Sequence, residues 1–395
     1  MDITIPTKEH RAAIEAAADA LRKSPGILPA LTLVRIEAHT DGLITFEGTD
    51  LEFGIRAETR GEVRVAGILC LPGAQLAEIA AESDPESQTV IRTDGAAGVI
   101  EVGRSRYQLA ASPAEEYLGN PDPTGGESVT LPGDSLRTMA GDVTWLVSKD
   151  ENHGTLCGVL IETSETVLRL VASNGKQLAL SETDVRGFTA GLSRIVPPQL
   201  LAKAERLLKG RGPVELSLAE SSVGLRTAGL TLTARTLGGD YPPFANVLPR
   251  KPTTTIVGPT AALLQAVRRV AAVARGHEFK AILARAEHGH VRMWSRAPDV
   301  GTAKDFVDAV VGGKAVTVAF NALMMEDVLA SVRSGDVRIR FHGPSGGILV
   351  DGRGSDPIRS LWLVAVVAQE SLDCTEPPDA DVTPIPVAEQ MAAAA

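Results

Sequence analysis

Residues 253–273 read TTTIVGPTAALLQAVRRVAAV: a short β-rich run, a proline, and then a helical pattern with a regular apolar stripe. The same order occurs twice upstream, in DITIPTKEHRAAIEAAADAL at 2–21 and in ESVTLPGDSLRTMAGDVTWL at 127–146. The offsets between the three segments are 125 and 126 residues. Chance similarity within one irregular α+β protein is the alternative, but agreement in both order and spacing favours an internal repeat.

Each repeat also restarts halfway along. The segments VRVAGILCLPGAQLAEIAAE, SRIVPPQLLAKAERLLKG and AVTVAFNALMMEDVLASVRSGD again read as strand, break and helix, and β-type runs follow every helix. The sequence therefore predicts an α+β fold of three repeated domains, each with two helices packed on antiparallel sheets. We expect the domains at 1–126, 127–252 and 253–369, followed by a flexible acidic tail at 370–395.

The composition is that of a soluble globular protein, with 44% hydrophobic and 22% charged residues in a chain of 395. The cysteines at 70, 157 and 374 show no paired spacing, which predicts neither disulfides nor a zinc site and favours a reducing compartment. We find no signal-peptide pattern and no apolar run of about 18 residues, so we expect no contact with a membrane.

Positive charge gathers on two of the predicted helices although the chain carries a net charge of −10. In PPQLLAKAERLLKG, which begins at Pro197, the basic residues lie opposite the apolar stripe. Segments 197–211 and 259–280 each carry a net charge of +3. A solvated helix face is the simple explanation, but such a surface also suits contact with phosphates that does not read the bases.

Six short motifs, in this order and spacing, resemble the bacterial sliding clamps, which are beta subunits of DNA polymerase III. They are GTDLE (48–52), GRSRYQLA (103–110), CGVLIET (157–163), VASNGKQLAL (171–180), YPPFANVLP (241–249) and AFNALMMEDVL (319–329). The resemblance covers roughly residues 1–369. It implies a homodimeric, head-to-tail ring whose helices line a hole for double-stranded DNA, bound without regard to sequence, and whose sheets form the rim.

The resemblance also implies a role without catalysis, cofactor or metal, in the cytoplasm with the nucleoid. The implied partners are the catalytic subunit of DNA polymerase III, the clamp loader and other proteins with clamp-binding motifs. The residues expected to contact DNA are Lys8, Arg11, Arg22, Lys23, Arg137, Lys149, Lys203, Arg206, Lys209, Arg268, Arg269 and Arg275. Those expected at the subunit interface are Arg104, Arg106, Tyr107, Leu109, Val273 and Asp305.

The proline-stiffened stretch at 241–249 corresponds to one wall of the family's hydrophobic pocket for partner peptides. Such stiffness limits the entropy lost when a peptide docks. The pocket positions fall on Thr155, Leu156, Ser173, Gly175, Lys176, Gln177, Leu178, Pro242, Asn246, Val247, Asn321, Met324, Val364, Ala365 and Val366.

The chain departs from the family at Gln177 and Asn246, where basic residues are common, and in its long C-terminal tail. An accessory clamp paralogue with an altered pocket and its own partners, such as an inhibitor-tolerant form, would explain these departures. The tail either has no role or competes with partner peptides for the pocket, since tethering raises its effective concentration.

Two histidine pairings offer other chemistry. His153 and Cys157 could form a thiol–base pair, although a buried inert cysteine is the commoner case in a strand. His288 and His290 could share a metal, but no third ligand lies nearby in sequence. The chain has no phosphate-binding loop motif, so nothing favours nucleotide binding.

Overall fold

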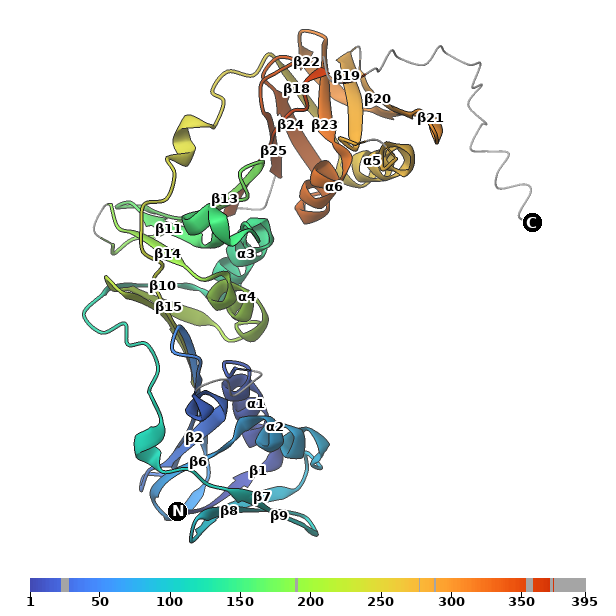
Figure 1. Cartoon of the computed structure of the whole chain (residues 1–395). Helices are drawn as coiled ribbons and strands as arrows, with labels where there is room; N and C mark the ends of the chain where they lie inside the picture. The colour runs from blue at the N-terminus through green and yellow to red at the C-terminus, as the bar shows by residue number, and fades with distance from the viewer. Residues whose placement is uncertain are drawn as a thin grey trace. The chain divides into compact units, whose positions relative to one another are not determined.

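The computed structural model describes residues 1–22, 28–188, 191–276, 278–287, 289–352, 358–369 and 372. Its elements follow one order three times, which confirms the predicted repeat (Figure 1). The first repeat contains β1 (Asp2–Pro6), α1 (Thr7–Ala18), β2 (Leu33–Ala38), β3 (Leu43–Thr49), β4 (Phe53–Arg60), β5 (Glu62–Val65), β6 (Gly67–Pro72), α2 (Gly73–Glu82), β7 (Gln88–Asp94), β8 (Ala97–Val102) and β9 (Ser105–Ala110).

The second repeat has the same elements, except that the described residues include no counterpart of β5. They are β10 (Glu127–Pro132), α3 (Gly133–Val143), β11 (Val159–Thr163), β12 (Val167–Ser173), β13 (Gln177–Asp184), β14 (Ser193–Val196), α4 (Pro198–Leu207), β15 (Pro213–Leu218), β16 (Ser222–Thr227) and β17 (Leu230–Arg235). The 3-10 turn Glu151–Cys157 precedes β11, and another, Phe244–Asn246, follows β17.

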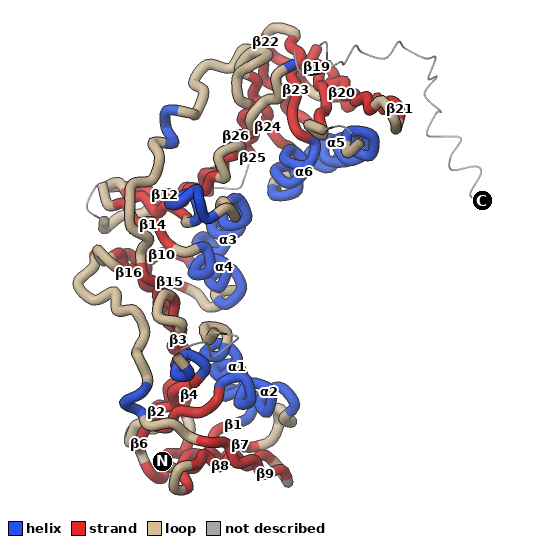
Figure 2. Tube along the Cα trace, in the orientation of Figure 1, coloured by secondary structure: helices blue, strands red, loops and turns tan. Residues whose placement is uncertain are grey.

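The third repeat restores the full order. Its elements are β18 (Thr254–Pro259), α5 (Thr260–Ala274), β19 (Ala281–Glu287), β20 (His290–Ala297), β21 (Gly301–Asp308), β22 (Val310–Gly313), β23 (Val316–Asn321), α6 (Ala322–Ser331), β24 (Asp336–Phe341), β25 (Ile348–Gly352) and β26 (Ile358–Val364). In all three repeats the two helices pack against each other (Figure 2).

Prolines set the strand-to-helix transitions. Pro6, Pro132 and Pro259 are the N-cap residues of α1, α3 and α5, with φ between −58° and −63°. Because the proline ring holds φ near this value and removes a backbone donor, each of these residues ends its strand and leads into the helix. The apolar stripe then packs on the sheet, as the full burial of Leu200, Leu201 and Ala204 in α4 illustrates.

The chain divides into two compact units, 1–242 with 356–360, and 243–355 with 361–395. Unit 1 contains a five-stranded sheet in the order β5-β1-β7-β8-β9 and an eight-stranded sheet in the order β10-β15-β16-β17-β4-β3-β2-β6. It also contains β14-β11-β12-β13, beside which lie the first residues of β26. Unit 2 contains β26-β25-β24-β18-β22 and the sheet β21-β20-β19-β23.

Several of the cations expected to contact DNA lie beyond the helix ends. The first, third and fourth helices end at Ala18, Val143 and Leu207, so Arg22, Lys149 and Lys209 follow them and are not on helix faces. Gly210, with φ +70°, takes a left-handed conformation that ends the helical run after α4. Arg275 is the C-cap of α5. Lys23 lies outside the described residues.

The start of the predicted tail contains a packed residue. Leu372 is 9% exposed and contacts a cluster of Ala281, Leu283, Trp294 and Ala319 in unit 2. Its amide donates to the carbonyl of Gln369. Packing therefore continues past the predicted boundary at 369, whereas residues 370, 371 and 373–395 lie outside the described residues.

Candidate functional site

One carboxylate holds two of the predicted DNA-contacting cations in unit 1. Asp19, the C-cap of α1, pairs with both Lys203 and Arg206 of α4. The Arg206 side chain remains 60% exposed, whereas those of Lys203 and Asp19 are about a quarter exposed. The cluster links the first repeat to the second and carries one net positive charge.

A second cluster in which one carboxylate holds two cations lies in unit 2. Glu326 of α6 accepts from Arg268 Nε at 2.9 Å and from Arg275 Nη2 at 3.4 Å. The two guanidinium groups are more than half exposed, whereas the Glu326 side chain is 19% exposed. This cluster also carries one net positive charge and leaves both cations accessible to solvent.

The remaining predicted cations are more scattered. Arg11 pairs with Glu15 at 2.9 Å and Arg137 with Asp134 at 3.2 Å, each within its own helix. Lys8 is exposed on the first turn of α1. The concentration of positive charge on helices is weaker than predicted, because α4 carries a net charge of only +1 and α5 of +2 within their bounds.

Arg269 differs from the other cations. Its Nε donates at 2.5 Å to Oδ2 of Asp305 in β21, a residue that was expected at the subunit interface. Asp305 is 19% exposed, and the Arg269 side chain is 58% exposed. The pair joins one residue predicted to bind DNA to one predicted to bind the partner subunit, and it lies beside an edge strand. Val273, one turn further along α5, is half-buried.

The expected interface residues of the first repeat lie on or beside β9, at the edge of the five-stranded sheet. Arg104, Arg106 and Tyr107 are exposed, and Leu109 is half-buried. Arg106 Nη1 lies 3.6 Å from Glu101 Oε1 on the neighbouring strand β8. β21, which contains the exposed Phe306, forms the edge of the four-stranded sheet in unit 2.

The predicted pocket residues gather in two groups. In unit 1, Thr155 Oγ1 donates to the carbonyl of Asp240 at 3.2 Å, which joins the 3-10 turn to the proline-rich stretch. The hairpin of β12 and β13 supplies the rest, and there Gln177 is only 5% exposed and accepts from Asn174 Nδ2 at 3.2 Å. The unit 1 group is Thr155, Leu156, Ser173, Gly175, Lys176, Gln177, Leu178 and Pro242.

The unit 2 group is built around the start of α6. Asn321 caps this helix by accepting from the amides of Leu323 and Met324. A β-bridge between Phe320 and Val366 brings the chain after β26 beside β23. The group comprises Asn246, Val247, Asn321, Met324, Val364, Ala365 and Val366, of which Val247 is 57% exposed.

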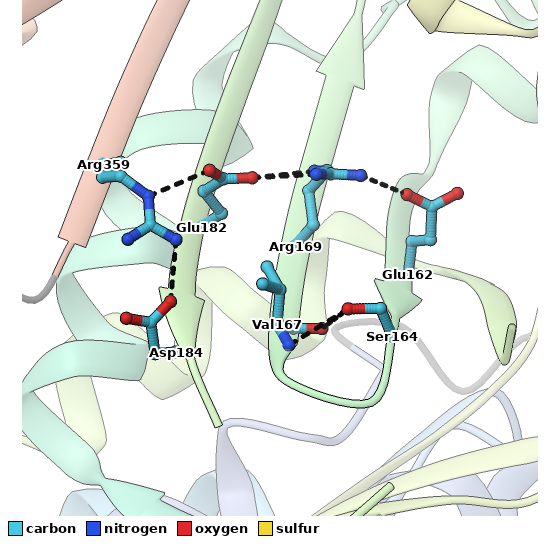
Figure 3. Close-up of polar contacts among 7 residues, drawn as sticks. All are labelled: Glu162, Ser164, Val167, Arg169, Glu182, Asp184 and Arg359. Atoms are coloured by element: carbon cyan, nitrogen blue, oxygen red, sulfur yellow. Dashed lines mark hydrogen bonds and ion pairs between the residues drawn. The ribbon is translucent and has the colours of Figure 1, made fainter. Parts of the chain in front are cut away.

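A ladder of alternating charges crosses the sheet of the second repeat (Figure 3). Arg169 of β12 pairs with Glu162 of β11 at 2.7 Å and with Glu182 of β13 at 2.9 Å. Arg359 of β26 continues the ladder, donating to Glu182 at 3.0 Å and to Asp184 at 2.8 Å. Arg359 lowers the pKa of Asp184 by hydrogen bonding and by its charge. These contacts hold residues 358–360 to unit 1.

The alternative chemistry finds no support in the described residues. The Cys157 thiol donates to the carbonyl of Asp150 at 3.1 Å, and the His153 imidazole instead bonds to Ser148 Oγ at 2.7 Å. His288 lies outside the described residues, which leaves its pairing with His290 untested. The described part of the chain contains no group of three potential metal ligands and no helix long and apolar enough to cross a membrane.

Three family models match the chain in consecutive order. They are the N-terminal domain of the DNA polymerase III beta subunit at residues 1–120, its central domain at 130–243 and its C-terminal domain at 245–365. A beta sliding clamp from Proteus mirabilis is 27% identical over 319 residues, covering 80% of this chain and 87% of the relative. One from Streptomyces coelicolor is 27% identical over 350 residues, covering 86% and 91%.

Solved structures show the same fold. A sliding clamp from Pseudomonas aeruginosa bound to griselimycin superposes with a TM-score of 0.88 at 22% identity, covering 93% of this chain and 99% of that one. The DNA polymerase III beta subunit from Thermotoga maritima gives a TM-score of 0.84 at 24% identity, with the same coverage.

Proposed function

The chain belongs to the family of DNA polymerase III beta subunits, and from this membership we propose that it is a DNA sliding clamp. It encircles duplex DNA and tethers the replicative polymerase for processive synthesis. The observation that carries the proposal is the match of all three family domains, in order, to three structural repeats. These similarities do not favour the accessory-clamp alternative.

The edge strands support a homodimer. β17, the last strand of the second repeat, pairs with β4 of the first, and the first residues of β26 lie beside β13. β9 has the place in the first repeat that β17 and β26 have in theirs, and β21 has the place in the third repeat that β4 and β13 have in theirs. Among the described residues, β9 and β21 each have a strand neighbour on one side only. A second copy supplies the missing neighbour of both strands, so two head-to-tail chains close a ring in which neither β9 nor β21 is left unpaired.

The cation clusters support contact with DNA that does not depend on sequence. A clamp must hold DNA without stopping on it, so it needs attraction to phosphates and no base reading. The clusters at Asp19 and Glu326 each supply exposed guanidinium groups, while the net charge of each cluster is only +1. We extend the proposal to the polymerase, clamp loader and other motif-bearing proteins, which bind through the two pocket groups, and to a cytoplasmic location with the nucleoid.

Retention on circular DNA tests this function. The protein, loaded by its clamp loader onto a nicked circular duplex, should remain bound when the salt concentration is raised to about 0.5 M, because enclosure does not depend on charge. Linearising the same DNA should release it within minutes by sliding off the ends. Equal retention on circular and linear DNA would contradict encirclement.

Asp19→Asn should strengthen binding to DNA. The substitution frees Lys203 and Arg206 from a carboxylate that competes with phosphate, so we expect a two- to fivefold higher affinity for linear duplex at low salt, and a steeper salt dependence. Fluorescence anisotropy with a labelled duplex measures both. Glu165→Gln, in the exposed turn between β11 and β12, changes the net charge equally and should have a smaller effect. Equal effects of the two variants would show that only net charge matters.

A further inference from the structure

The junction at β13 gives a template for the contact between two copies of the chain. On one face of the sheet, Arg359 donates to Asp184, the last residue of β13, at 2.8 Å (Figure 3). On the other face, Ser360 and Ser181 both donate to the carboxylate of Asp142 in α3. Asp142 is 1% exposed and Ser181 is fully buried. One strand is thus held by an ion pair on one side and by a buried polar cluster on the other.

The strand registers identify the equivalents of this junction at β9. Tyr107 lies opposite Ile100 on the neighbouring strand, Ile100 lies opposite Ile91, and Ile91 lies opposite Ile3. In the third repeat, the same steps from strand to strand lead from Trp362 through Val350 and Ile339 to Ile256. Ile3 and Ile256 both lie three residues before the proline that caps the first helix of their repeat. Counting back from Tyr107 and Trp362, Ser105 is equivalent to Ser360, and Arg104 to Arg359.

The same counting identifies the equivalents at β21. β13 and β21 each contain eight residues and end at Asp184 and Asp308. The capping positions before α4 and α6 are Pro197 and Asn321. The strand pairings connect Ser181 to Arg194, which lies three residues before Pro197. They connect Asp305 to Val318, which lies three residues before Asn321, so Ser181 and Asp305 are equivalent. Asp142 and Arg269 are both the tenth residue of their helices.

We propose that the ring closes through an ion pair between Arg104 of one copy and Asp308 of the partner subunit, as Arg359 pairs with Asp184 within the chain. Ser105 then lies against the partner subunit's Asp305, which Arg269 of the same chain already holds at 2.5 Å. Asp305 is therefore part of the polar cluster behind the strand and not the ion-pair partner of Arg104. This inference rests on the proposed homodimer.

The register also assigns a different role to Arg106. In the pairing of β17 with β4, Thr231 lies opposite Arg56, and the equivalent positions are Arg106 and Lys304 of the partner subunit. Two like charges opposite each other do not stabilise a strand pair. Glu101, 3.6 Å away in its own chain, balances Arg106 instead. Arg104 and Arg106 thus differ in their predicted contribution although they are two residues apart.

The three junctions have different chemistry at the same position. Between the first two repeats, Leu230 lies opposite Ala57, and Ala16 is the equivalent helix residue, so the contact is apolar. At β13 it consists of a carboxylate and hydroxyl groups, and at β21 of an arginine–aspartate pair. An edge strand placed at the wrong junction leaves buried polar groups without partners, which costs more than it gains. The chemistry at the junctions therefore favours the pairing of β9 with β21 between copies.

Charge exchange between separately purified variants tests the ion pair. Arg104→Asp and Asp308→Arg should each weaken the homodimer about tenfold or more, because both interfaces of the ring then bring like charges together. Mixing the two variants should restore dimers of near wild-type affinity. In the mixed ring one interface is the native pair and the other is the reversed pair. Analytical ultracentrifugation measures affinity, and a mass tag on one variant identifies the mixed ring.

Two controls make the result specific. Arg106→Ala, on the same strand, should leave dimer affinity unchanged or raise it, and Arg104→Asp mixed with Asp305→Arg should not be rescued. Wild-type protein that stays monomeric would overturn the proposed homodimer itself. A wild-type dimer that tolerates Arg104→Asp, or that is weakened more by Arg106→Ala than by Arg104→Ala, would overturn the assigned register and leave the homodimer intact. Circular dichroism of each variant checks that it is folded.

Discussion

Replacing Lys203, Arg206, Arg268 and Arg275 together with alanine should abolish detectable binding to linear duplex and sharply reduce retention after loading. Asp19 and Glu326 remain, so each cluster changes from one net positive charge to one net negative charge. The proposed DNA-facing surface then repels phosphate instead of merely losing attraction. With about 0.9 units of salt slope for each phosphate contact, loss of these contacts from both subunits should flatten the salt dependence of binding.

The matched control removes four exposed cations from strands and turns and has the same effect on net charge: Arg64, Arg226, Arg296 and Lys314 to alanine. This control should bind DNA within a factor of about two of wild type, because charges beyond a Debye length of about 10 Å contribute little. Equal losses in both quadruple variants would show a general effect of net charge and would refute the assigned DNA-contacting residues. Sedimentation should give the same dimer for both.

The repeat could be predicted from sequence because proline marks the same strand-to-helix step in every copy. Helix ends were harder, since the charged residues after α1 and α4 continue a helical composition and the stop signals in the sequence, Pro25 and Gly210, come only several residues later. The carboxylates that hold the cations were missed. Asp19 and Arg206 are 187 residues apart, and only the packing of one repeat on the next brings them together.

The charge ladder illustrates the same limit. Arg169 lies between Leu168 and Leu170, which a strand pattern predicts, but Glu182 lies between two hydroxyl residues, and the order of the ladder across four strands depends on register. Leu372 was missed for a different reason. It is a single apolar residue in an acidic, proline-rich stretch, so composition outweighed it.

Acid should destabilise the protein through His10 before most carboxylates are protonated. His10 lies in the first half of α1, is 1% exposed, and burial lowers its pKa from 6.5 to about 4. Between these values the unfolded chain binds a proton that the folded chain does not. Stability is therefore fully present above pH 6.5 and falls as the pH drops toward 4, by about 3.5 kcal/mol at about 1.4 kcal/mol for each unit of pKa.

Urea unfolding between pH 7.5 and 4.5 measures this loss. His10→Gln should lower stability at pH 7.5, because the site is closely packed, but its unfolding free energy should fall much less with acid than that of wild type. His39→Gln, at a partly exposed histidine, should preserve the wild-type slope. Parallel pH profiles for wild type and His10→Gln would assign the acid sensitivity to other groups. Because α1 also carries Lys8 and Arg11 and is capped by Asp19, protonation of His10 should loosen part of the proposed DNA-facing surface along with the first repeat, and weaker DNA retention should accompany the loss of stability.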